Sequence, residues 1–293
     1  MQVDISFLGD HRARLGESPL WDDANDCLWW VDAIGQRIRA SDLAGNLLTD
    51  IATDQPVGSI GLAAGGLIVA LTDEFHLLDA ASGRMECLAR LPGNRTGKRL
   101  NDGKVDPAGR YICGDFAADC ADGGTVWQLD PSGAVRAIEQ GVRIANAICF
   151  APDGRTMYLA DSLEGVLRSY PYDPSTGELG QRLDLADCNA LGSGPDGATT
   201  DSAGDVWTTL VLAQALACFS PAGELLRRFD LPVPYPSCPA FGGPARDTLF
   251  VTSISDSGHR IKVDDPDGGR ILVIRGLGAT GLPEPRFGVN RHG

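Results

Sequence analysis

The chain has 293 residues, 43% of them hydrophobic, and its 37 glycines and 18 prolines suit a fold with a large core and many turns. Its net charge is −14, from 39 acidic and 25 basic residues. A chain this acidic repels phosphate backbones and anionic lipid, so we expect neither nucleic acid nor a membrane surface as a partner.

One local pattern recurs along the chain: a polar stretch, a short strand, a tight turn and a second strand. It is clearest around residues 101–113, where 101–103 are turn formers that predict a loop. Residues 104–105 predict a short strand, and Asp106-Pro107-Ala108-Gly109 is a β-turn signature. The turn and its following strand recur, in chain order, at residues 21–31, 62–69, 106–113, 150–159, 200–209 and 241–251.

Each copy continues into a second, hairpin-like half, such as the strand at 126–129 and the turn at 130–133. Four short strands per period, repeated six times, are typical of a β-propeller. We therefore predict an all-β, six-bladed β-propeller that forms a single domain, residues 1–293. Residues 210–216 have a helix-favouring composition, but the repeat register predicts strand there. The apolar residues 5–8 belong to no unit and are expected to close the ring on the last blade.

Equivalent positions of propeller repeats lie at equal height around the central axis. Counting back five residues from the second position of each turn gives one set in common register: Glu17, Gly58, Asn101, Asn146, Asp196 and Ser237. Four of these six carry carboxylate or amide oxygens, which we expect to converge at one end of the channel. Such donors suit a hard divalent cation such as Ca²⁺, Mg²⁺ or Mn²⁺, without which the carboxylates would repel each other. The alternative is an ion that only fastens the blades.

Several stretches resemble the signature motifs of the SMP-30/gluconolactonase/regucalcin-like (LRE) family: Gly16-Glu17-Ser18-Pro19-Leu20-Trp21, residues 99–106, Pro195-Asp196-Gly197, Phe241-Gly242-Gly243 and residues 281–287. The resemblance runs nearly from end to end. It implies a six-bladed propeller with one divalent metal on its axis that hydrolyses sugar lactones to sugar acids. The identity of that metal stays open among Ca²⁺, Zn²⁺, Mg²⁺, Mn²⁺ and Fe²⁺.

The resemblance also implies roles for individual residues. On the matching motif positions, the family's metal ligands fall on Glu17, Asn146 and Asp196, and its substrate-contacting residues fall on Arg99 and Asn101. In the mechanism this implies, the metal makes the lactone carbonyl more electrophilic and stabilises the oxyanion. Asp196 is then the candidate general base. Coordination lowers the pKa of a carboxylate and weakens it as a base, so the sequence leaves open whether Asp196 is base, ligand or both.

Two departures from the family pattern affect the site. The usual Asn-Gly pair is Asn146-Ala147, which should keep the ligand but alter the turn. The family's acidic lid residue matches Asp119, in a lid that is shorter and different, so its role as a substrate-binding residue is a weaker expectation.

Other chemistries have less support in the sequence. Ser18 is not in a GxSxG context and the histidines lie outside the common register, which argues against a serine hydrolase. His76 lies in a strand-like segment and reads as a structural histidine. The eight cysteines form no CxxC, so neither a zinc–thiolate site nor a disulfide framework is expected.

We therefore expect a sugar lactonase acting on aldonolactones such as glucono-, xylono- or galactonolactone. Two alternatives remain: a metal-dependent hydrolase of another ester or phosphoester, and a non-catalytic calcium-binding or ligand-sensing propeller. No signal peptide and no apolar stretch of membrane-spanning length are visible, which favours the cytoplasm. A monomer or weak homodimer is expected.

Overall fold

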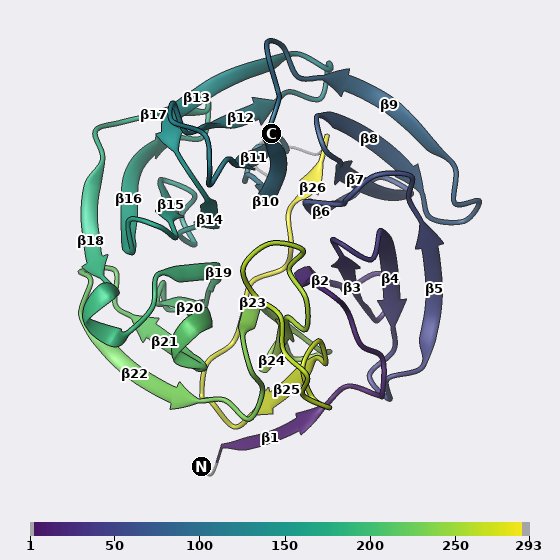
Figure 1. Ribbon diagram of the computed structural model, residues 1–293, viewed down its shortest axis with the longest axis vertical. Helices are drawn as coiled ribbons and strands as arrows, with labels where there is room; N and C mark the ends of the chain where they lie inside the picture. The colour runs from purple at the N-terminus through teal and green to yellow at the C-terminus, as the bar shows by residue number, and fades with distance from the viewer. Residues whose placement is uncertain (1–2, 289–293) are drawn as a thin grey trace.

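The computed structural model describes residues 3–288 (Figure 1). Its strands form six sheets in a ring around a central axis, and the described residues contain no α-helix. The prediction of an all-β, six-bladed propeller is therefore confirmed. Within the same residues, no helix is long and apolar enough to cross a membrane.

The first three blades follow one another along the chain. Blade 1 contains β2 (Gly16–Asp22), β3 (Cys27–Asp32), β4 (Arg37–Ser41) and β5 (Leu47–Ala52). Blade 2 contains β6 (Ser59–Ala63), β7 (Gly66–Ala70), β8 (Glu74–Asp79), β9 (Met85–Arg90) and the short β26 (Arg286–Phe287), which is parallel to β6. Blade 3 contains β10 (Arg99–Val105), β11 (Tyr111–Phe116), β12 (Gly124–Leu129) and β13 (Val135–Val142).

The last three blades complete the ring. Blade 4 contains β14 (Ala145–Phe150), β15 (Thr156–Asp161), β16 (Val166–Asp173), β17 (Glu178–Leu179) and β18 (Leu183–Asp187), and the 3-10 helix η1 (Asn189–Leu191) follows it. Blade 5 contains β19 (Pro195–Thr200), β20 (Val206–Leu210), the 3-10 helix η2 (Val211–Ala213), β21 (Ala215–Phe219) and β22 (Leu225–Asp230). Blade 6 contains β23 (Pro236–Gly242), β24 (Thr248–Ser253), β25 (Leu272–Arg275) and β1 (Asp4–Phe7).

Blade 6 combines one strand from near the N-terminus with three strands from the C-terminal part of the chain. The N-terminal β1 pairs antiparallel with β25, from Asp4 opposite Arg275 to Phe7 opposite Leu272. The expectation that residues 5–8 close the ring is therefore confirmed. The N-terminal strand β1 thus forms part of the last blade (Figure 1), and backbone pairing between the two ends of the chain closes the ring of blades.

Burial falls from the inner strands to the rim. Every residue of β3 and of β14 is buried, because both faces of an inner strand pack against neighbouring blades. The outermost β5 alternates between half-buried and exposed residues, and β22 is mostly exposed. The innermost strands are therefore held most rigidly, and their ends surround the axis.

Two segments differ from the simplest expectation. The helix-favouring stretch 210–216 forms only the 3-10 turn η2 between strands β20 and β21, so the repeat register prevails over composition. Residues 101–103, expected as a loop, lie inside β10, where the pairing with β11 slips between Leu100 and Gly103. The turn-forming residue types at 101–103 thus mark a β-bulge inside a strand.

Candidate functional site

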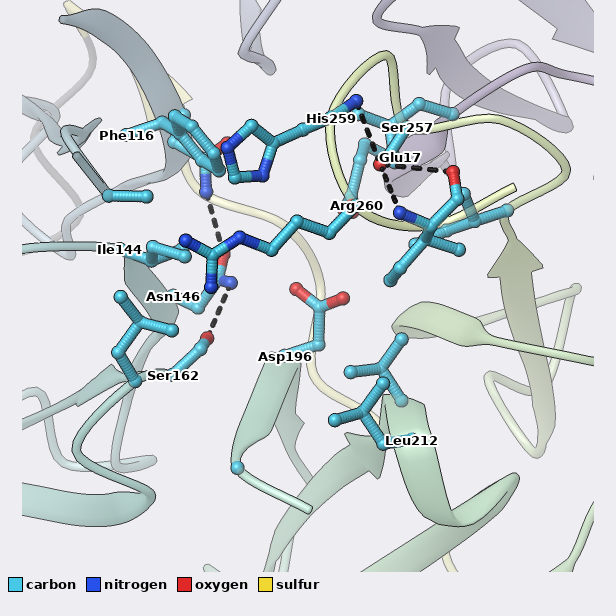
Figure 2. Close-up of a pocket in the computed structure, with 18 of the residues that line it drawn as sticks. Glu17, Phe116, Ile144, Asn146, Ser162, Asp196, Leu212, Ser257, His259 and Arg260 are labelled. Atoms are coloured by element: carbon cyan, nitrogen blue, oxygen red, sulfur yellow. Dashed lines mark hydrogen bonds between the residues drawn. The ribbon is translucent and has the colours of Figure 1, made fainter.

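The inner strands enclose one end of the axis around a cavity of about 260 Å³. Four residues of the predicted register line it: Glu17 on β2, Asn101 on β10, Asn146 on β14 and Asp196 on β19. Figure 2 shows the Asp196 side chain projecting into this space, with Asn146 on a neighbouring blade. The other two positions of the register, Gly58 and Ser237, do not line the cavity.

Bulges in the innermost strands aim these side chains. Pairing between the first two strands slips directly after Glu17 in blade 1 and directly after Asn146 in blade 4. It slips around Asn101 in blade 3 and around Asp196 in blade 5 as well. Blade 2 has no such slip in its first pair of strands and supplies no oxygen ligand at this level. A bulge re-aims side chains and is frequent beside active sites, so the repeated bulge accounts for the convergence.

The residue after each of two candidate ligands has a left-handed backbone. The φ angle is +49° at Ser18 and +56° at Ala147. Ala147 therefore adopts the left-handed conformation that a glycine favours. The left-handed backbone of a non-glycine residue costs about 1 kcal/mol. Burial of the Ala147 methyl group in a core cluster offsets this cost.

Two aspartates hold the chain immediately before the ligands. The Asp32 carboxylate accepts hydrogen bonds from the backbone N–H groups of Arg14 and Leu15, at 3.1 and 3.2 Å. In the same way, Asp161 accepts from the backbone N–H groups of residues 143 and 144, at 2.9 and 3.2 Å. Each carboxylate thus fixes the segment that leads into a candidate ligand, Glu17 or Asn146. Sequence reasoning missed both residues.

A chain of hydrogen bonds connects blades 3, 4 and 5 along the cavity wall. Arg99 Nη1 donates to Asn101 Oδ1 at 2.8 Å, and Asn101 Nδ2 donates to Asn146 Oδ1 at 2.9 Å. Asn146 Nδ2 then donates to Ser162 Oγ at 2.8 Å (Figure 2), and Ser162 Oγ donates to the Pro195 carbonyl at 2.7 Å. This chain orients both amides and fixes Asn146 with its Oδ1 retaining one acceptor lone pair.

The site concentrates negative charge. Burial raises the pKa of Glu17 well above its usual range, and the nearby carboxylates of Asp196 and Asp102 raise it further. Burial, followed by the charge of Asp102, raises the pKa of Asp196. Burial also raises the pKa of Asp102 to about 6, although that carboxylate accepts a hydrogen bond from the backbone N–H of Ile148. The nearby Arg99 guanidinium acts in the opposite direction on Glu17 and Asp196.

These residues fit a divalent cation. The half-buried Glu17 and the buried Asp196, whose charge raises the pKa of Glu17, form a hard-oxygen donor set together with the fixed amide oxygen of Asn146. Glu17, Asn146 and Asp196 could hold such an ion, and its charge would remove the repulsion between the carboxylates.

Arg99 is placed to hold a ligand. Among the described residues only its Nη1 donates, to Asn101 Oδ1 and the Leu100 carbonyl, which leaves Nη2 and Nε without a hydrogen-bond partner in a side chain that lines the cavity. Its guanidinium carbon lies 4.6 Å from the centre of the Phe116 ring. This contact keeps the guanidinium in position at a cavity wall that also carries Asn101.

Two loops, residues 117–123 and 254–269, contribute side chains to the cavity wall and are called the entrance loops. The second loop reaches from blade 6 towards the centre of the ring (Figure 1) and contacts blade 3. His259 Nε2 lies 3.0 Å from Asp119 Oδ2, and Arg260 Nη2 donates to Asp119 Oδ1 at 3.3 Å. The His259 ring packs edge-on against Phe116, with 5.5 Å between centres (Figure 2).

Asp119 does not line the cavity, unlike the other candidate site residues. Asp119 is exposed and joins the two entrance loops, whereas the cavity is lined by His259 and Arg260, which sequence reasoning did not single out. No repeat signal could have found them, because they lie in an insertion outside the common register.

Known proteins resemble this chain over nearly its whole length. The family model described as SMP-30/Gluconolactonase/LRE-like region matches residues 15–255. The chain is 33% identical to 6-deoxy-6-sulfogluconolactonase of Pseudomonas putida, covering 93% of this chain and 94% of that protein. It is 31% identical to regucalcin of Gallus gallus, covering 97% and 98%. The solved structure of a calcium-binding protein, regucalcin, from Agrobacterium tumefaciens is 28% identical, with a TM-score of 0.88 and 97% of each chain covered.

Proposed function

The chain belongs to the SMP-30/gluconolactonase/LRE-like family, and from this premise we propose that it is a metal-dependent lactonase that opens sugar lactones to sugar acids. The observation that carries the proposal is the shared cavity. The donors of Arg99 and Asn101 lie beside the oxygen set of Glu17, Asn146 and Asp196. A structural ion alone would not require a ligand-holding guanidinium at its side.

The size and polarity of the cavity suit a small hydroxylated ring. Its volume of about 260 Å³ lies just below the range of about 300–1,000 Å³ typical of sites for drug-sized ligands. The unpartnered Nη2 and Nε groups of Arg99 would donate hydrogen bonds to the hydroxyl oxygens of a sugar lactone and fix the orientation of its ring. The apolar Phe116, Ile144 and Leu212 would exclude water from the ring faces.

We assign the proton transfer to Asp196. Burial raises its pKa, and no described residue donates a hydrogen bond that would stabilise its charge. A raised pKa makes the ionised carboxylate a stronger base, and a bound cation would keep it ionised at neutral pH, where it can take a proton from the water that attacks the lactone carbonyl. A divalent cation held by Glu17, Asn146 and Asp196 would polarise that carbonyl and stabilise negative charge on its oxygen. The relative named 6-deoxy-6-sulfogluconolactonase supports a hydrolytic role, and the solved structure described as a calcium-binding protein, regucalcin, supports a cation-binding role.

The test is a panel of glucono-, xylono- and galactonolactone, followed by release of acid, with each divalent cation in turn. We expect at least one lactone to be opened. If no lactone is opened but a simple ester or phosphoester is hydrolysed, the protein is a hydrolase of that other substrate class. No hydrolysis at all, with a cation that still raises the melting temperature, would favour a calcium-binding protein.

The base assignment has its own test. Asp196→Asn keeps the shape and one oxygen donor but cannot accept the proton. Its turnover should stay about 10²–10⁴-fold low even when elemental analysis shows a full metal site. Near-normal turnover in the fully metallated variant would leave Asp196 as a ligand only.

A further inference from the structure

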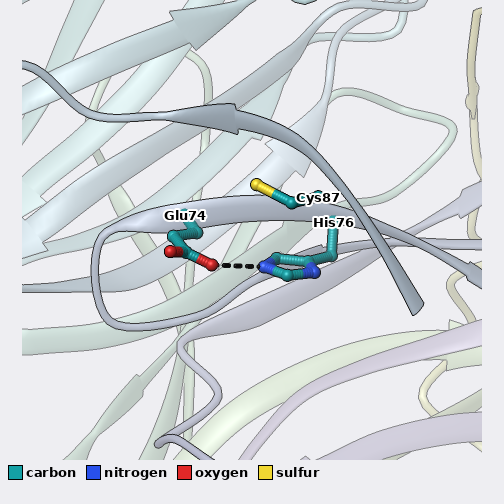
Figure 3. A group of neighbouring side chains, drawn as sticks. All are labelled: Glu74, His76 and Cys87. Atoms are coloured by element: carbon teal, nitrogen blue, oxygen red, sulfur yellow. Dashed lines mark hydrogen bonds and ion pairs between the residues drawn. The ribbon is translucent and has the colours of Figure 1, made fainter.

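A second group of metal-ligating side chains lies on the outer strands of blade 2, away from the central cavity (Figure 3). Glu74 and His76 are two residues apart on β8, so they point to the same face of the sheet. Cys87 on β9 is paired directly opposite His76. The pairing slips between Phe75 and His76, a bulge that brings the three side chains together at the rim.

The three side chains offer one ligand atom each, and these atoms all lie within 4.8 Å of one another. In a tetrahedral zinc site, bond lengths of about 2.0–2.3 Å place ligand atoms roughly 3.3–3.8 Å apart. The Glu74 Oε2 to His76 Nε2 contact of 2.7 Å is shorter than this and contains a shared proton. A metal ion that replaces the proton needs only small side-chain rotations to reach all three atoms.

Each ligand atom is available. Arg90 Nη2 lies 2.8 Å from the other Glu74 oxygen, Oε1, and balances the carboxylate charge without covering Oε2. His76 Nδ1 is buried and makes no hydrogen bond among the described residues. The contact between Nε2 and Glu74 is therefore the one hydrogen bond of the ring among these residues that favours a proton on Nε2. Cys87 is exposed, and its Sγ has only a weak contact with the Ala89 carbonyl at 3.8 Å. The exposed thiol gives an ion a path into the group.

We propose that Glu74, His76 and Cys87 form a second divalent-metal site, selective for a borderline ion such as Zn²⁺. A thiolate and an imidazole favour such ions, whereas the oxygen donors of the central cavity suit harder ones. Water completes the tetrahedron. Binding releases the thiol proton, the ring proton of neutral His76 moves from Nε2 to the unpartnered Nδ1, and the ion joins the outer strands β8 and β9. Cys87 lies too far from His76 along the chain to form a recognisable metal-binding motif. The pairing of β8 with β9 brings the two residues together.

Co²⁺ is the probe that distinguishes this site from the central one, because a thiolate ligand gives a sulfur-to-cobalt charge-transfer absorption in the near ultraviolet. Titration of the reduced protein without oxygen should produce this band at one equivalent per chain, and Zn²⁺ should displace it. Cys87→Ser should abolish the band, and His76→Gln should weaken the apparent Co²⁺ affinity at least tenfold. Cys120→Ser is the matched control, because Cys120 is the other cysteine that is not buried. It should retain the band.

The site is independent of the proposed lactonase activity. Cys87→Ser should open lactones at the wild-type rate, since Cys87 does not line the cavity. Absence of the band in wild-type protein at saturating Co²⁺, or its persistence in Cys87→Ser, would overturn the inference whatever the outcome of the lactone assays.

Discussion

Replacing Asp196 by asparagine is expected to stabilise the metal-free protein at neutral pH, although it should weaken the proposed metal site. Burial and Asp102 raise the pKa of Asp196 from 3.8 to about 8. The folded protein therefore holds a proton that the unfolded chain has already released. Raising the pH through this interval lowers the free energy of unfolding, and the stability of the metal-free wild type is lost as pH rises.

The size of the effect follows from the pKa shift. A difference of one bound proton changes the free energy of unfolding by about 1.4 kcal/mol per pH unit. Between pH 5 and 7 the metal-free wild type should therefore lose up to about 3 kcal/mol that Asp196→Asn does not lose. With a divalent cation at about 1,000 times its dissociation constant the order should reverse, because binding then stabilises the wild type by about 4.1 kcal/mol.

The assay is urea unfolding in the presence of chelator, at pH 5 and pH 7, for wild type and Asp196→Asn. The exposed Asp264 supplies the matched control, Asp264→Asn, which should follow the wild type at both pH values. A stability difference between Asp196→Asn and wild type that is the same at both pH values would refute the electrostatic reasoning.

Three further predictions follow from the site. Arg99→Ala should keep its metal by elemental analysis and raise KM for the lactone, whereas Glu17→Gln should lose metal; equal metal loss in both would show the roles to be misassigned. Asp161→Asn should lower stability by about 1–3 kcal/mol in urea unfolding, because it removes one of the two charged oxygens that accept from the partly buried N–H groups of residues 143 and 144. Unchanged stability would contradict this. Asp119→Asn should loosen the entrance loops and raise KM a few-fold with little change in melting temperature; an unchanged KM would separate the loop contact from substrate entry.

The sixfold repeat in the sequence predicted both the fold and most residues of the candidate site. Turn signatures at regular spacing specify the blades, and one register position per blade identified Glu17, Asn101, Asn146 and Asp196 as neighbours. The same residue types misled locally at 101–103, because Asn, Asp and Gly favour a bulge inside a strand as well as a loop.

Features that depend on tertiary contacts were not predictable. His259 and Arg260 reach the cavity only because an insertion in blade 6 crosses to blade 3, and nothing in its own sequence specifies the partner. The supporting carboxylates Asp32 and Asp161 were also missed. They bind backbone N–H groups of another segment, an interaction that any residue in that segment can supply.

The proposed lactonase should require a divalent metal to open lactones. Protein stripped by chelator and then restored with a divalent cation should be assayed for acid release, with metal content measured on the same samples. We predict that turnover falls in proportion to metal content and returns when Glu17, Asn146 and Asp196 are loaded again. Undiminished lactone opening in protein shown to be metal-free would contradict the proposal.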